Sequence, residues 1–176
     1  MNLIFVIILA VSLSMDAFSL AIAYGTLNLQ KNKIFLISLV VGIYHFFMPL
    51  IGLLVGEIII KHISISSDII VFIVLLFIGM QMIVESFKNK NKIKKVEIIE
   101  IILFGFAVSI DSLSVGISMN AFEIKPFICT TIFSITSFIF TYIGLLFGKK
   151  LNSIFGKIST IIGGILLIIL GIIYLI

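Results

Sequence analysis

Ser14-Met15-Asp16-Ala17-Phe18-Ser19 decides how this chain folds, together with a second stretch, Ser109-Ile110-Asp111-Ser112-Leu113-Ser114. Each stretch places one aspartate inside a run of apolar residues that is long enough to cross a lipid bilayer. A carboxylate at the centre of a membrane helix costs about 2.5–3.5 kcal/mol on insertion scales. The chain carries this cost in both of its halves. We therefore expect both aspartates to have a function.

The composition excludes an ordinary soluble domain. The chain has 176 residues, of which 61% are hydrophobic and 11% are charged, whereas about 25% of the residues in soluble domains are charged. The single cysteine, Cys129, has no partner for an internal disulfide and cannot form a thiolate metal cluster alone. The basic residues lie in loops, so a sequence pI near 9.2 indicates membrane topology rather than nucleic-acid binding.

Apolar runs separated by short polar patches predict an all-α membrane protein with six transmembrane helices. Pro49 lies inside the second run, where we expect a tilt, a kink or a break, and Pro126 suits the first turn of the fifth helix. The spans leave no room for a soluble catalytic domain, so residues 1–176 are predicted to form a single transmembrane domain. The predicted spans are Leu3–Ala23, Ile34–Ile60, Ile69–Phe87, Ile98–Ala121, Phe127–Gly148 and Ile158–Ile176.

The lysines predict the orientation of the chain in the membrane. Ten of the 12 basic residues lie in the first, third and fifth predicted loops, and only Lys61 and Lys125 fall on the other side. Because loops rich in lysine stay in the cytoplasm, these three loops are predicted to be cytoplasmic and both termini to lie outside.

The two halves of the chain repeat each other. Asp16 and Asp111 are 95 positions apart, and Ser14 and Ser109 match at the same offset. A second match joins the Ile-Gly-Leu-Leu-Val-Gly segment that starts at residue 51 to the Ile-Gly-Leu-Leu-Phe-Gly segment that starts at residue 143.

Three predicted spans lie in each half, in residues 1–87 and 98–176, with a basic loop at 88–97 between them. An odd number of spans makes the second half start on the opposite side of the membrane. The sequence therefore predicts an inverted repeat, an architecture that secondary transporters use with substrate sites near the midplane. At 1.5 Å per residue, each aspartate would lie ~20 Å deep in a hydrocarbon core ~30 Å thick.

Small and hydroxylated residues share a helix face with each aspartate, and such faces allow close packing and hydrogen bonding between helices. If the two faces packed together, their carboxylate, hydroxyl and carbonyl oxygens would suit a hard divalent cation such as Mn²⁺ or Mg²⁺. Two close carboxylates repel each other when both are ionised, so protons would replace a departing metal. The alternative is that each aspartate only holds the bundle together through a hydrogen bond. The two faces are Ser12, Asp16, Ser19 and Ala23, and Ala107, Asp111, Ser114 and Ser118.

Other polar and small residues also lie in or beside the predicted spans. His45 could be a metal ligand, a proton relay or a hydrogen-bonded packing residue. Gln81 is expected at the membrane interface, and Glu97 and Glu100 are expected to favour the N-terminus of the fourth helix through its dipole. Four glycines have the G-x-x-x-G spacing of close helix crossings, namely Gly52, Gly56, Gly144 and Gly148.

Three segments carry a resemblance to a known family: Ser-Met-Asp-Ala-Phe at 14–18, Met-Pro-Leu-Ile-Gly at 48–52 and Ser-Ile-Asp-Ser-Leu at 109–113. They make the chain similar to the MntP family of bacterial manganese efflux pumps over nearly its whole length. The related YtaF-type sporulation membrane proteins share the aspartate motifs, but the 48–52 segment fits MntP better. The resemblance implies Mn²⁺ export from the cytoplasm, with Asp16 and Asp111 as essential residues.

The same resemblance makes Gly25 a family-like glycine and Glu85 the acid that ends the third helix. The chain departs from some relatives in two places: they carry an acidic or amide residue where His45 stands, and an arginine near the position of Gln81. These two differences bear on which residues coordinate the metal and on which metal the protein prefers. For Glu85 the structural alternative is a solvated pair with Lys88 three residues later.

We therefore expect a secondary transporter in the bacterial cell membrane, not an enzyme, that exports Mn²⁺ in exchange for protons. Asp16 and Asp111 would bind the metal, and Mn²⁺ would be a transported substrate rather than a cofactor. Membrane lipid is the other expected partner, nucleic acid is not, and the sequence leaves open whether the chain forms a homo-oligomer. The residues expected to line the path are Ser12, Ser14, Ser19, Ser109, Ser114, His45 and Glu85, together with backbone carbonyls.

Three other functions compete with this one. A transporter of another divalent cation or a small solute would use the same aspartates, although no buried lysine or arginine is available to hold an amino-acid carboxylate. A non-transporting sporulation or structural protein would show no metal phenotype on deletion. An intramembrane aspartyl protease also uses two aspartates, but the glycines of a G-x-G-D motif are absent here.

Overall fold

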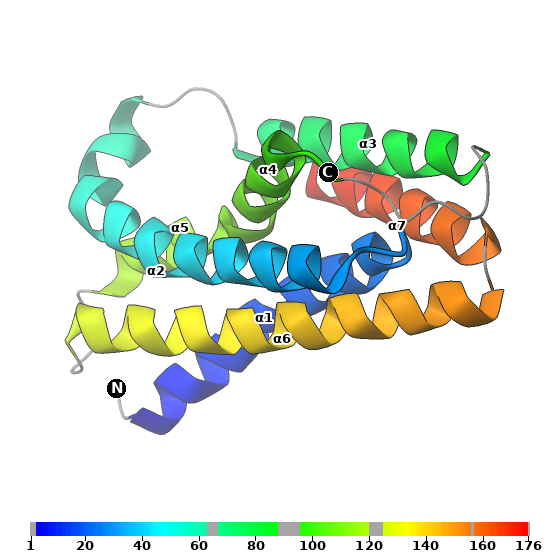
Figure 1. Cartoon of the computed structure of the whole chain (residues 1–176). Helices are drawn as coiled ribbons and strands as arrows, with labels where there is room; N and C mark the ends of the chain where they lie inside the picture. The colour runs from blue at the N-terminus through cyan, green and yellow to red at the C-terminus, as the bar shows by residue number, and fades with distance from the viewer. Residues whose placement is uncertain (1–2, 63–66, 88–95, 120–124, 156, 176) are drawn as a thin grey trace.

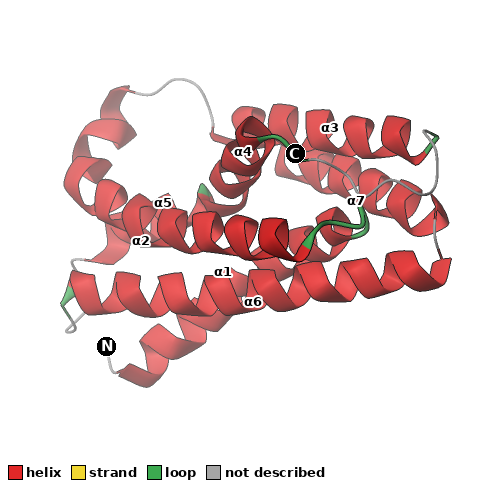
Figure 2. Ribbon diagram, in the orientation of Figure 1, coloured by secondary structure: helices red, strands yellow, loops and turns green. Residues whose placement is uncertain are grey.

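The protein is a bundle of helices joined by short turns and loops (Figure 2). The computed structural model describes residues 3–62, 67–87, 96–119, 125–155 and 157–175. Most of the predicted basic loop at 88–97 therefore lies outside the described residues. The helices of the described part are α1 (Leu3–Gly25), α2 (Lys31–His62), α3 (Ser67–Ser86), α4 (Ile98–Ser109), α5 (Asp111–Ser118), α6 (Pro126–Phe155) and α7 (Lys157–Leu175).

Helix length and surface chemistry identify a membrane protein. Among the described residues, three segments are long and apolar enough to cross a bilayer: α1, the Lys31–Leu54 part of α2, and α6. The outer surface carries large apolar side chains, such as Ile4 (71% exposed) and Leu54 (79% exposed). Lipid suits such a surface, and a chain in lipid must satisfy its backbone hydrogen bonds internally, which favours helices.

The remaining predicted spans correspond to shorter apolar helices. These are Leu75–Val84 within α3, Ile98–Ser109 and Lys157–Ile173. α2 continues through Pro49, so the predicted break does not occur, and Figure 1 shows that the helix bends in its second half. α6 begins at Pro126, as expected for a residue that lacks an amide hydrogen.

The fourth predicted span is not one continuous helix. We predicted a single helix over Ile98–Ala121, but α4 ends at Ser109 and α5 begins at Asp111. Figure 1 shows the two helices running in different directions. The break falls immediately before the second aspartate, and residues 106–115 around it contain neither glycine nor proline.

Helices from the two halves exchange partners. α1 packs mainly against α6, α5 packs against α2, α2 also packs against α6, and α3 packs against α7. Each of these pairs joins a helix from the N-terminal half to a helix from the C-terminal half. The main buried core accordingly contains residues of both halves, including Leu20, Tyr24, Phe104 and Leu145.

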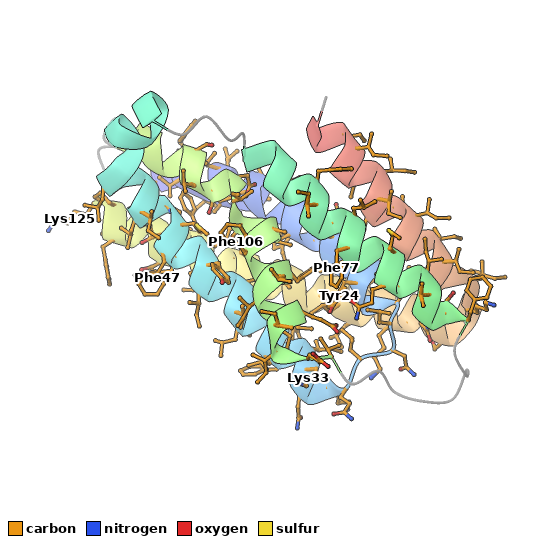
Figure 3. The ribbon with its side chains drawn as sticks, turned by 90° about the horizontal axis from the view of Figure 1, so that it is seen from above. Tyr24, Lys33, Phe47, Phe77, Phe106 and Lys125 are labelled. Carbon is orange, nitrogen blue, oxygen red and sulfur yellow. The ribbon has the colours of Figure 1, made fainter. Side chains whose placement is uncertain are left out.

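The described lysines mark the two ends of the bundle, and Figure 3 labels Lys33 and Lys125 far apart along it. Lys149 Nζ donates to Leu29 O (2.6 Å), which brings the end of α6 to the turn that follows α1. Lys157 Nζ lies 3.6 Å above the centre of the Phe87 ring, which joins the start of α7 to the end of α3. We call this the lysine-rich end. Its described lysines are Lys31, Lys33, Lys149, Lys150 and Lys157.

Candidate functional site

Two glycine crossings fix the positions of the aspartate motifs. A Cβ atom on Gly144 of α6 would lie 2.8 Å from Phe18 O of α1, and a Cβ on Gly52 of α2 would clash with Leu113 O of α5. Phe18 and Leu113 each lie two residues after their aspartate. The same crossing therefore occurs twice, and each time it places an aspartate motif against a glycine of the other half.

Asp111 lies at the break between α4 and α5. Its Oδ1 accepts a hydrogen bond from the Ser112 amide (2.8 Å), and Ser112 Oγ donates to Ser109 O. The Leu113 amide bonds to Ile110 O at 3.2 Å, three residues back instead of four. Aspartate and serine side chains thus replace part of the regular helical hydrogen bonding, as these residue types do at helix ends.

Asp16 lies within the continuous helix α1 and its side chain is exposed, as are those of Ser12 and Ser19. The two aspartate-bearing faces do not pack extensively against each other, because α1 packs chiefly against α6 and touches α4 over a short stretch. Direct packing of one face on the other, which was the condition for a shared set of oxygen ligands, is therefore not seen over most of α1.

The serines that precede the aspartates are buried. Ser14 is 0% exposed, and its Oγ lies 2.7 Å from Ala10 O and 3.0 Å from Ser137 Oγ on α6. Ser109 is also buried, and its Oγ donates to Gly105 O at 2.7 Å. Ser114, by contrast, is exposed. Two of the five predicted serines are thus inside the bundle, and Ser12, Ser19 and Ser114 are on its surface.

His45 is fully buried in α2, with 0% of its surface exposed. Its Nδ1 lies 3.0 Å from Val41 O, and its Nε2 has no hydrogen-bond partner among the described residues. Further contacts place it along α4 and α5: Gly105 meets Val40 and Tyr44, just before His45 in the sequence, and Gly116 meets Pro49 one turn after it. His45 therefore lies at about the level of the α4–α5 break.

Other predicted residues are placed as follows. Gly148 crosses α1 so closely that a Cβ atom would lie 2.9 Å from Gly25 Cα, which makes Gly25 part of the same crossing. Gly56 lies in α2 and Glu85 near the end of α3, but their surroundings lie outside the described part of the structure.

Sequence reasoning missed the environment of Glu100. This residue is only 7% exposed, and its carboxylate accepts hydrogen bonds from Gln81 Nε2 (2.8 Å) and Tyr24 OH (3.4 Å). Glu100 was expected to act through the helix dipole, and Gln81 to lie at the interface. No local signal in the sequence marks this environment, because the partners of Glu100 lie 19 and 76 positions away.

The arrangement can offer oxygen ligands to a cation but holds no ready-made metal cluster. In the part of the chain that the structure describes, no three side chains of His, Cys, Asp or Glu lie together as a metal site. Two carboxylates, buried hydroxyls and the carbonyls at a broken helix are the groups that hard divalent cations prefer. Charged side chains within membrane helices mark ion or substrate paths.

The fold and these residues define a class: a helical multi-pass membrane protein with an aspartate motif in each half. The chain belongs to the Mntp family, whose model is described as "Putative manganese efflux pump" and matches residues 28–175. The resemblance drawn from the three sequence segments is thereby confirmed.

Individual relatives agree with this assignment. A protein of Methanobrevibacter smithii is 37% identical over 175 residues, which cover 97% of this chain and 95% of the relative. A protein of Bacillus pumilus is 36% identical over 153 residues, which cover 86% of this chain and 83% of the relative. Both are named "Putative manganese efflux pump MntP". No solved structure matches the chain.

Proposed function

We propose that this protein is a secondary transporter that exports Mn²⁺ from the cytoplasm in exchange for protons. One observation carries the proposal: each half contributes an aspartate motif that packs closely against a glycine of the other half. The names of the relatives favour Mn²⁺ as the cargo.

In this proposal six spans form an inverted repeat of two halves, with α4 and α5 together forming the fourth span. The exchange of partners between the halves supports this arrangement. α1 pairs with α6 just as the α4–α5 span pairs with α2, and the crossing of Gly144 with Phe18 mirrors that of Gly52 with Leu113. The lysine-rich end would face the cytoplasm, and both termini would lie outside.

Asp16 and Asp111 would bind the metal at the middle of the bundle, with serine hydroxyls and carbonyls of the broken helix as further ligands. His45 is buried and its Nε2 atom has no hydrogen-bond partner among the described residues, which supports a place for this residue beside the path. Two carboxylates balance the 2+ charge of the metal, and protons would replace it after release because two close ionised carboxylates repel each other. Alternating access would come from one half rocking against the other.

The proposal is tested in a bacterial strain that lacks its own manganese exporter. The wild-type chain should restore growth on rising MnCl₂ and lower cellular manganese. Asp111→Asn and Asp16→Ala should do neither, although both reach the membrane in normal amounts. A well-expressed wild-type chain that changes neither growth nor manganese content would overturn the assignment of Mn²⁺.

A further inference from the structure

Glu100, Gln81 and Tyr24 form a buried polar cluster near the lysine-rich end, outside the site described above. The Glu100 carboxylate of α4 accepts from Gln81 Nε2 of α3 at 2.8 Å and from Tyr24 OH of α1 at 3.4 Å. Tyr24 is 1% exposed and Glu100 7%. One carboxylate therefore ties together three helices that belong to both halves of the chain.

Apolar residues fill the space between this cluster and Asp111. The Tyr24 ring stacks on Phe104, one turn further along α4, with ring centroids 4.6 Å apart. Ala107 and Val108 continue the same side of α4 and are 5% and 2% exposed. A hydrated cation cannot pass such a close-packed layer, because packed interiors leave few voids larger than one water molecule.

The turn after α1 is also tied down at this end. Asn152 Nδ2 of α6 and Thr160 Oγ1 of α7 both donate to Thr26 O, and Lys149 Nζ donates to Leu29 O. Hydrogen bonds thus hold α1, α6 and α7 together at the same end as the Glu100 cluster. In this conformation the lysine-rich end is closed.

Among the described residues, the opposite end shows no equivalent of the cluster at the positions related by the repeat. At the offset of 95 positions that relates the aspartates, Glu100 corresponds to Phe5 and Tyr24 to Met119. Met119 belongs to an apolar cluster with Val6, Cys129 and Phe133. The described residues therefore differ between the two ends: a hydrogen-bonded carboxylate links helices at the lysine-rich end, and apolar residues pack together at the other.

We propose that Glu100 is a positioning residue that holds the lysine-rich end of the transport path closed through Tyr24 and Gln81. Opening exchanges these two hydrogen bonds for water or for the arriving cation, whose preferred ligands are carboxylate oxygens. A carboxylate suits this task because water or a cation replaces its lost hydrogen bonds when the helices separate. An apolar contact that opens gains no such replacement interaction. The inference rests on the proposed transport function but not on the identity of the metal.

Thiol labelling tests the gate without any metal. In a Cys129→Ser background, a single cysteine in place of Ala107 reports whether the layer between Glu100 and Asp111 is open. A membrane-impermeant maleimide is added to vesicles of each orientation. Tyr24→Phe, which removes one hydroxyl group, and Glu100→Gln should each raise the labelling rate about fivefold or more, and only from the lysine-rich side.

Glu97→Gln is the matched control, because Glu97 is an exposed glutamate at the same helix end and its loss should leave labelling unchanged. If Glu100→Gln does not fold, Tyr24→Phe decides the question. Labelling rates equal to those of the parent, or raised equally by Glu97→Gln, would overturn the gate.

Transport measured on the same variants separates a gate from a merely structural cluster. A looser gate should let vesicles lose a preformed Mn²⁺ gradient faster, while the concentration for half-maximal transport stays within about twofold of the parent, because Asp16 and Asp111 are untouched. An equal loss of Mn²⁺ from parent and variants would count against the gate. If the parent moves no Mn²⁺ but the labelling result holds, the proposed cargo fails and the gate stands.

Discussion

The crossing of α1 and α6 predicts a large difference between two glycine substitutions. A Cβ atom at Gly148 would lie 2.9 Å from Gly25 Cα and closer still to Ile22 O, whereas a Cβ at Gly171 would lie 3.3 Å from its nearest neighbour, Leu75 Cβ. Ordinary contacts begin near 3.4 Å, so Gly148→Ala must push the two helices apart by at least half an ångström. Gaps of this size forfeit about a quarter of the dispersion energy of each contact.

Alanine gains about 1 kcal/mol over glycine in a helix at either position, so comparing the two variants cancels this term. Overpacking a close contact costs about 1–3 kcal/mol. Gly148→Ala should therefore be less stable than Gly171→Ala by about 1–3 kcal/mol, which is about a 5- to 150-fold change in the ratio of folded to unfolded protein.

The assay is unfolding of the purified protein in mixed micelles with rising SDS, followed by circular dichroism. Because packing is the main force between helices in lipid, no hydrophobic gain should offset the cost of the overpacked contact. A Gly148→Ala variant as stable as Gly171→Ala would refute the close crossing of α1 and α6.

Three further predictions concern hydrogen bonds and coupling. Ser14→Ala should lower the free energy of unfolding by about 0.5–1.5 kcal/mol, because it removes the bond to Ser137, whereas Ser12→Ala at an exposed site should change it by less than about 0.5 kcal/mol; equal effects in the SDS titration would contradict the buried contact. His45→Leu should lower the rate of Mn²⁺ export while changing the free energy of unfolding little, because Nε2 has no described partner to lose. Export at the parental rate would show that His45 is not part of the path. An ionophore that collapses the proton gradient should stop export by wild-type vesicles, and undiminished export would exclude proton exchange.

The membrane class and most helix positions could be predicted from the sequence because lipid allows few alternatives. A long apolar run in lipid must form a helix, and a lysine-free run of about 20 residues has the length and composition of a transmembrane helix. The aspartate motifs could be found because they repeat in the two halves. Together with the segment at 48–52 they also indicated the family. The G-x-x-x-G spacing pointed to Gly144 and Gly148, whose close contacts with α1 the structure then placed.

The break before Asp111 and the burial of Glu100 could not be read from the pattern. Ile110 keeps helical backbone angles, φ −66° and ψ −30°, so no unusual residue marks the break, and it depends on side-chain bonds made by Asp111 and Ser112. The burial of Glu100 depends on partners 19 and 76 positions away. Helix pairing decides such contacts, and the pairing follows from packing in three dimensions rather than from local sequence.

Mn²⁺ flux into liposomes that contain only the purified protein tests the central claim most directly. Wild type should move Mn²⁺, and Glu97→Gln, which changes an exposed acid, should move it at the same rate. Asp16→Asn and Asp111→Asn should both fall to the rate of protein-free liposomes while remaining folded by size-exclusion chromatography. Full flux in either aspartate variant, or no flux in the folded wild type, would contradict the account.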